Sequence, residues 1–141
     1  MTFAELKLDE LKDPVALLMN SFFTPSESSK AAGQEYLQRL KLRSSDCDAP
    51  VSMKSAGAQL DAIREWGIVP EKDRYSMLSK IRRPMLILHG QKDIVVTPIN
   101  TFLLEQHLPD AQILMYPDAS HAAHSQYADV FLGYAGQFLN A

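Results

Sequence analysis

The sequence contains very little cysteine, since Cys47 is the only one among 141 residues. A single thiol cannot form an internal disulfide, which excludes a small secreted domain held together by disulfides. The sequence also lacks any apolar run close to the roughly 18 residues that span a bilayer. Its first residues alternate charged and apolar side chains, where a signal peptide would have an apolar core. These absences predict a soluble, cytoplasmic protein that does not interact with membranes.

Neither sign of charge is in large excess. Lys and Arg number 14 and Asp and Glu number 17, giving a net charge of −3, and the two halves of the chain are similarly balanced. This balance argues against a nucleic-acid-binding face and against an acidic tail. With 46% hydrophobic and 22% charged residues, the composition is typical of a globular protein. The length corresponds to a single domain, because domains usually contain about 100–200 residues.

The first half of the sequence has the apolar spacing of helices. Asp13, followed by proline, is a typical helix start. Residues 24–27 (TPSE) match a capping box with Thr24 at the cap, which predicts a second helix that runs to about residue 42. Ser52 can cap a third helix, which Gly67 would end.

The second half of the sequence alternates between strand and helix patterns. Residues 84–90 (PMLILHG) form a short apolar run between proline and glycine, as is typical of a buried parallel strand. A helix is expected to begin at residues 97–98, and residues 111–116 (AQILMY) form a second strand before a last apolar helix. The order of residues 84–139 therefore predicts a crossover unit of an α/β sheet.

Two loops that follow these strands carry residues capable of acid–base chemistry. Asp93 follows the first strand and His121 follows the second. Because functional groups of open α/β sheets lie beyond the carboxyl ends of the strands, we expect these two side chains to meet. A carboxylate bonded to one imidazole nitrogen fixes the tautomer and leaves the other nitrogen as a general base. The pair would form the acid–base half of a nucleophilic triad.

Residues 84–139 resemble the C-terminal end of the α/β-hydrolase fold. The segment LHGQKD (residues 88–93) is similar to that family's seventh strand and acid-bearing loop. The segment HLPDAQILMYPDASH (residues 107–121) is similar to its last strand and histidine loop. Residues 1–70 resemble the helical cap that many members insert before the seventh strand.

The resemblance implies an α/β protein with two parallel strands and flanking helices, preceded by a helical cap. Residues 1–70 would form the cap, and residues 71–141 would form the core segment. The resemblance also implies that Asp93 is the triad acid and His121 the triad base, that no cofactor is needed, and that the substrate is a small ester or acyl compound.

The nucleophile elbow of this family, Gly-x-Ser-x-Gly, is absent. None of the six glycines is followed two positions later by Ser or Cys. The resemblance then implies a truncated hydrolase that begins at the cap, supplies only the acid and the base, and is inactive alone. Residues 84–89 would expose a strand edge, which soluble proteins avoid. Three arrangements remain open: coverage by the cap helices, a homodimer, or a complementing N-terminal half on another polypeptide. The alternative function is that of a non-catalytic remnant that binds a partner.

Other candidate residues favour simpler interpretations. A metal site at Asp118, His121 and His124 lacks a further Cys or His in the cluster, so no metal is expected. Cys47 lies in a polar loop without a neighbouring base, which argues against a catalytic thiol. His89, at a strand end, is expected to be structural. Four large apolar residues of the cap are expected to form its core, with a substrate cleft as the alternative: Phe22, Phe23, Met53 and Trp66.

Overall fold

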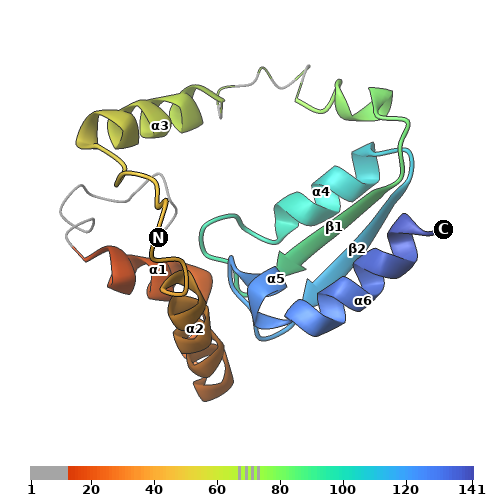
Figure 1. Ribbon diagram of the computed structural model, residues 1–141. Helices are drawn as coiled ribbons and strands as arrows, with labels where there is room; N and C mark the ends of the chain where they lie inside the picture. Colours follow the sequence, from red (N-terminus) through yellow and green to blue (C-terminus); the bar gives the residue numbers. More distant parts are fainter. Residues whose placement is uncertain (1–12, 67, 69, 71, 73) are drawn as a thin grey trace.

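The computed structural model describes residues 13–66, 68, 70, 72 and 74–141 (Figure 1). In chain order the elements are α1 (Pro14–Phe22), α2 (Glu27–Leu40), α3 (Met53–Trp66), the short 3₁₀ helix η4 (Leu78–Lys80), β1 (Met85–Gly90), α4 (Ile99–His107), β2 (Ala111–Tyr116), α5 (Ala123–Gln126) and α6 (Ala128–Leu139). None of the helices in this part of the chain has the length and hydropathy that crossing a membrane requires.

The sheet consists of β1 and β2, which run parallel from the pair Met85 and Ala111 to the pair Gly90 and Tyr116. The strands lie between α4, which connects them, and α6 (Figure 1). The predicted crossover unit is therefore confirmed. The first strand is less buried than its apolar pattern predicts, because all of β1 except Gly90 is half-buried. Within the described residues β1 pairs only with β2, so its other edge has no strand beside it.

The helix starts follow local side-chain chemistry. Asp13 caps α1 as predicted, because its carboxylate accepts hydrogen bonds from the backbone N–H groups of Val15 and Ala16. The predicted cap of α2 is wrong by two residues. Ser26, not Thr24, caps this helix, and its hydroxyl accepts from the backbone N–H of Ser29.

The C-terminal helical region also differs from the single helix that the pattern predicted. It consists of a short helix, α5, and a longer one, α6, which meet at Tyr127. The ring of Tyr127 stacks on Tyr116 at the end of β2, with 4.5 Å between ring centroids and 5° between ring planes. This stacking fixes the junction of the two helices against the sheet. At the end of α3, the predicted stop at Gly67 lies outside the described residues.

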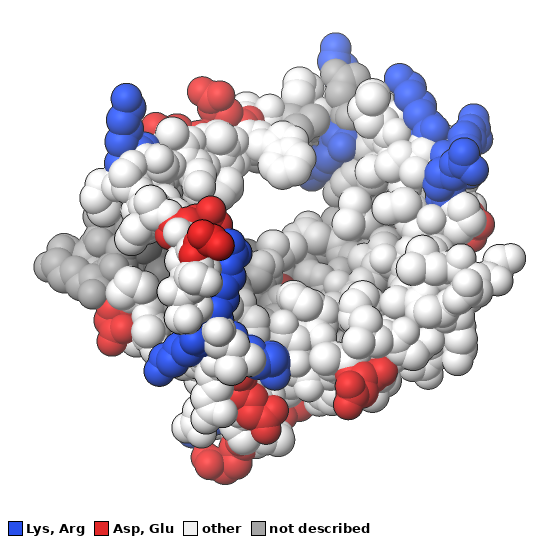
Figure 2. Space-filling view, in the orientation of Figure 1, with Lys and Arg blue, Asp and Glu red and all other residues white. Residues whose placement is uncertain are grey.

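The best-buried part of the structure lies where the α1–α2 turn meets the loop after β2. Phe23 is 3% exposed, and Ala119, Ala122 and Ala123 are fully or almost fully buried. In α3, by contrast, no residue is buried. Met53 is 64% and Trp66 84% exposed, so the expectation that both belong to a cap core is wrong. The space-filling view shows an opening between α3 and the strand-bearing part of the molecule (Figure 2).

Candidate active site

The acid loop after β1 folds around Asp93. One carboxylate oxygen, Oδ1, accepts hydrogen bonds from the backbone N–H groups of Val95 at 2.7 Å and Val96 at 3.0 Å. This local turn is typical of aspartate after a strand, and it buries the residue to 6% exposure. The second carboxylate oxygen, Oδ2, is left to face the histidine loop.

His121 completes the contact between the two loops. Its ring atom Nδ1 lies 2.9 Å from Oδ2 of Asp93. A carboxylate oxygen can only accept, so Nδ1 carries the proton and Nε2 is the nitrogen left to accept one. The ring of Phe22 packs against the imidazole, with 5.5 Å between centroids, and the His121 side chain remains 38% exposed. The structure therefore brings together the two residues that the sequence singled out.

The hydrogen bond between them shifts both pKa values. Burial by itself raises the pKa of Asp93, but hydrogen bonds from His121, Val96 and Val95 outweigh burial, so the pKa lies below its usual value. The same carboxylate raises the pKa of His121 above its usual value, against a smaller opposing effect of burial. The arrangement favours an ionised acid beside an imidazole that holds its proton more firmly than a free one.

The two loops approach each other closely at Gly90. A Cβ atom at this position would lie 2.6 Å from the backbone carbon of Ala119 and closer still to the carbonyl oxygens of Ala119 and Ser120. Only glycine allows this approach without moving the backbone. The backbone N–H of Lys92 also donates to the carbonyl of Ala119 at 2.9 Å. The end of β1 and the histidine loop are thus locked together.

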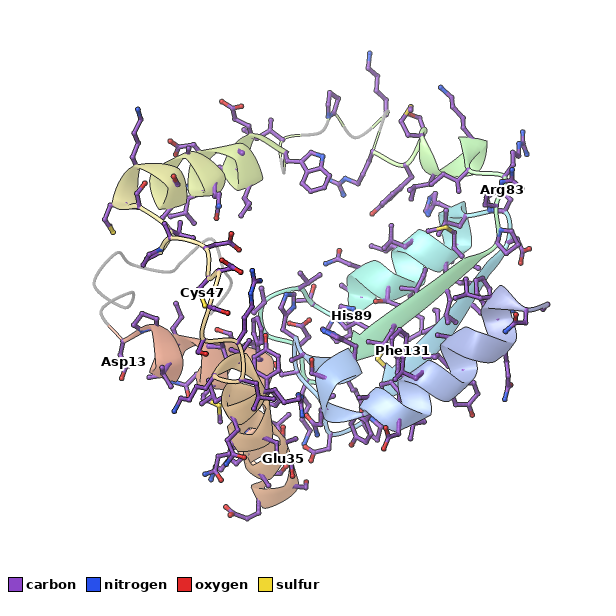
Figure 3. All side chains as sticks on the ribbon, viewed as in Figure 1. Asp13, Glu35, Cys47, Arg83, His89 and Phe131 are labelled. Carbon is purple, nitrogen blue, oxygen red and sulfur yellow. The ribbon has the colours of Figure 1, made fainter. Side chains whose placement is uncertain are left out.

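His89 is a second imidazole beside the acid, at the carboxyl end of β1 (Figure 3). Its Nε2 donates to the carbonyl oxygen of Val96 at 2.9 Å and lies 3.4 Å from Oδ2 of Asp93, while Nδ1 accepts from the hydroxyl of Thr101 at 2.8 Å. Both ring nitrogens are therefore occupied, and the ring ties the acid loop to α4. From the sequence, the position of His89 at the end of a strand predicted a structural role, but it did not identify these partners.

Two cavities flank the histidine loop. One, of about 550 Å³, lies between α1, α2 and the acid loop, and Phe23, Ile94 and Ser120 contribute to its walls. The other, of about 320 Å³, lies beside β1 and α4, and its walls include both His89 and His121. Of the four apolar residues expected in a cap core or a cleft, Phe23 lines the first cavity, and the other three line neither: Phe22, Met53 and Trp66.

The remaining candidates lie apart from the Asp93–His121 pair. Asp118 faces the start of α2, where three hydroxyl groups donate to it, and sequence reasoning considered it only as a metal ligand. No group of three or more His, Cys, Asp or Glu side chains among the described residues is arranged to hold a metal ion. Cys47 is exposed on the connection between α2 and α3, and its thiol donates to the carbonyl of Arg43 (Figure 3).

Comparison with proteins of known structure identifies the fold that carries the Asp93–His121 pair. An α/β-hydrolase fold protein from Chitinophaga pinensis, of known structure, is 32% identical and superposes with a TM-score of 0.83 over 94% of this chain. The chain has the fold of the α/β-hydrolase family over the part of these proteins that it matches. The predicted fold class is thereby confirmed. A 2-hydroxy-6-oxo-6-phenylhexa-2,4-dienoate hydrolase from Rhodococcus has the same fold, with a TM-score of 0.64 at 16% identity over 90% of this chain and 43% of its own.

Curated proteins match shorter stretches of this chain. The human protein named serine hydrolase BPHL is 29% identical over 82 residues, which is 57% of this chain and 28% of that protein. A pimeloyl-[acyl-carrier protein] methyl ester esterase from Nitrosospira multiformis is 31% identical over 65 residues, 46% of this chain and 25% of its own. No family model matches the chain. The chain thus spans about a quarter of these curated relatives and 47% of the Chitinophaga protein.

Proposed function

We propose that Asp93 and His121 are the acid and the base of a hydrolase that cleaves ester or related acyl bonds. The observation that carries the proposal is the 2.9 Å hydrogen bond from Nδ1 of His121 to Oδ2 of Asp93, which leaves Nε2 to accept a proton. An ester substrate fits the names of the relatives, which include a serine hydrolase and a methyl ester esterase.

In the proposed mechanism, Asp93 holds the imidazole of His121 in the Nδ1–H tautomer. Nε2 then removes the proton from a serine hydroxyl as its oxygen attacks the ester carbonyl, and it returns that proton to the departing alcohol. A water molecule releases the acyl group by the same route. Asp93 stays ionised throughout and stabilises the imidazolium.

The proposed serine belongs to a part of the fold outside these 141 residues, since they contain no Gly-x-Ser-x-Gly. In support, the match to the Chitinophaga protein covers less than half of that protein. We further propose that residues 1–70 act as the cap of the complete enzyme and residues 71–141 as its acid- and histidine-bearing core segment.

A chimera tests this function directly. The part of the Chitinophaga protein that precedes the matched region would be fused to this chain, and the product would be treated with a fluorophosphonate probe and with p-nitrophenyl esters. We expect labelling of the serine and ester hydrolysis, with His121→Ala and Asp93→Asn each lowering kcat by roughly 10⁴-fold. His124→Ala is the matched control, because His124 lines the same cavity as His121 without contacting Asp93.

The pH profile of the chimera provides a second check. The base must be neutral to act, and its pKa is raised above the usual 6.5 by Asp93. Activity should therefore be lost on the acid side at a pH above 6.5, and Asp93→Asn should move that limb to lower pH. The proposal would be contradicted if the chimera were folded and active and His121→Ala changed neither its rate nor its pH profile. A folded chimera that neither hydrolyses esters nor reacts with the probe would favour the non-catalytic alternative.

A further inference from the structure

Asp118 joins the histidine loop to the start of α2 through three side-chain hydroxyl groups. Its Oδ1 accepts from the hydroxyl of Thr24 at 2.7 Å, and its Oδ2 accepts from Ser26 at 2.6 Å and Ser28 at 3.1 Å. We call these four residues the hydroxyl clasp. The ammonium group of Lys92, on the acid loop, lies 3.8 Å from Oδ1 of Asp118.

The clasp depends on an ionised carboxylate. Hydrogen bonds from Ser26 and Thr24, and less strongly from Ser28, lower the pKa of Asp118 against a smaller effect of desolvation. An ionised carboxylate has only lone pairs to offer, so it can accept from all three hydroxyls at once. Hydrogen bonds to a charged acceptor are also stronger than those between neutral groups.

The loop beyond Asp118 is attached to the end of α1 at successive positions. The hydroxyl of Ser120 donates to the carbonyl of Ser21 at 2.7 Å, and the backbone N–H of Ala122 donates to the carbonyl of Phe22 at 3.1 Å. His121 lies between these two attachments. Its own backbone N–H also donates to the carbonyl of Ser21 at 3.4 Å, so its backbone is placed by contacts to the end of α1, about 100 residues away in the sequence.

We propose that Asp118 is a positioning residue: through the hydroxyl clasp it holds the histidine loop so that the His121 ring meets Asp93. The inference rests on the proposed function, because it concerns the same acid–base pair. The geometry has little tolerance. A shift of the loop by about 1 Å would lengthen the 2.9 Å contact beyond hydrogen-bonding distance, and displacements of that size at a reacting centre can cost roughly 10²-fold in rate.

Histidine NMR of the full chain, labelled with ¹⁵N in its imidazoles, tests the proposal without needing activity. In the unaltered protein His121 should show the Nδ1–H tautomer and a raised pKa. Asp118→Ala should lower the pKa of His121 toward its usual value and mix the two tautomers, because the ring would no longer face Asp93. A role in stability alone would lower the unfolding midpoint and leave the tautomer and pKa of His121 in the folded protein unchanged.

Two further variants separate positioning from the direct effect of a nearby negative charge. The double variant Thr24→Val, Ser28→Ala removes two hydroxyl donors but keeps the charge of Asp118 and the helix cap at Ser26. It should lower the His121 pKa in the same direction as Asp118→Ala. Glu27→Gln is the matched control, since this carboxylate lies on the same helix turn, is exposed and pairs with Lys30. It should leave the His121 spectrum unchanged.

The outcomes are distinct. If Asp118→Ala shifts His121 but the hydroxyl double variant does not, the effect is one of charge and the clasp proposal is wrong. The proposal is also wrong if neither variant shifts it. If Asp93→Asn leaves the pKa of His121 unchanged, the acid–base pair itself fails, and the proposed function falls with it. If the circular dichroism spectrum shows that Asp118→Ala does not fold, the pKa and tautomer of His121 are measured in the isosteric Asp118→Asn and in the double variant instead. Unchanged values in both would contradict the proposal.

Discussion

The α1–α2 region and α3 lie in the same half of the sequence but differ in how they are attached. The α1–α2 turn buries Phe23 and three hydroxyl-bearing side chains against the histidine loop: Ser21, Thr24 and Ser29. Helix α3 buries none of its residues, and Trp66 at its end is 84% exposed. In Figure 1, α1 and α2 lie close to the histidine loop, while α3 stands apart from the sheet.

The difference shows that polar contacts, more than an apolar core, attach the α1–α2 region to the strand-bearing half of the chain. Hydroxyl donors join the α1–α2 region to the histidine loop at Asp118 and to α5 at Gln126, and the buried apolar side chains among the described residues are Phe23 and three alanines. Buried polar groups are costly unless every partner is present. The junction should therefore be sensitive to single atoms, and α3 should tolerate almost any surface change.

The largest difference is expected between two aromatic truncations. Phe23→Ala removes a side chain that is 3% exposed and packs on Tyr36, so it should lower the free energy of unfolding by about 3 kcal/mol or more. Trp66→Ala removes a larger ring that is already in water and should change it by less than about 0.5 kcal/mol. Urea unfolding of both variants measures the two effects. Equal losses would show that α3 is packed more tightly than its exposure indicates.

Gly90→Ala tests the contact between β1 and the histidine loop. The new methyl group would collide with backbone atoms of Ala119 and Ser120, which cannot turn aside as a side chain can. We expect a loss of about 1–3 kcal/mol in the free energy of unfolding, together with a weakened bond between His121 and Asp93. Gly133→Ala, in α6 with no atom within 4 Å of its Cβ, is the control. An unchanged His121 resonance in a stable Gly90→Ala protein would show that the loops separate without cost.

Two serine-to-alanine substitutions, one in each region, compare the effect of removing a single hydroxyl oxygen. Ser29 is 0% exposed, and its hydroxyl accepts from the backbone N–H of Thr24 at 2.8 Å and donates to Gln126 at 2.7 Å. Ser29→Ala leaves both partners unsatisfied and should cost about 1–3 kcal/mol. Ser55→Ala, in exposed α3, should stay within about 0.5 kcal/mol. Thermal unfolding midpoints measured side by side would reveal any departure from this order.

The same contrast explains how far the sequence could be interpreted. Residues 111–116 were predicted as a strand and form β2 with those bounds, because strand and turn signals are local. The geometry of Asp93 and His121 also follows from local rules, since parallel strands end at one edge of the sheet. The N-cap of α2 could not be predicted, because it depends on a distant contact. The hydroxyl of Thr24 donates to Asp118, 94 positions away, and Ser26 caps the helix.

Burial was harder to predict than secondary structure. Helix α3 carries apolar residues at helical spacing, and the spacing correctly predicted a helix after Ser52. Spacing states which residues share a face and not whether anything covers that face. Trp66 and Met53 were therefore expected in a core, and both are exposed. The role of Asp118 was missed for another reason: the residues around Thr24 were interpreted only as a helix start, and they meet Asp118, more than 90 positions away, only in the fold.

The smallest effect, and one of opposite sign, is expected at Gly57 in α3. A Cβ atom at Gly57 meets nothing within 4 Å, so Gly57→Ala should stabilise the helix by about 1 kcal/mol, which slows amide exchange within α3 by roughly fivefold. Because α3 buries nothing, the unfolding midpoint of the α1–α2 junction should stay where it is. Gly33→Ala, in α2, should instead lower the stability of the α1–α2 junction and leave amide exchange in α3 unchanged. The reason is that its Cβ would lie 2.6 Å from the Met19 side chain and 2.9 Å from Phe23. If Gly57→Ala raised both stabilities together, α3 and the junction would unfold as one unit, and the distinction between the two regions would be wrong.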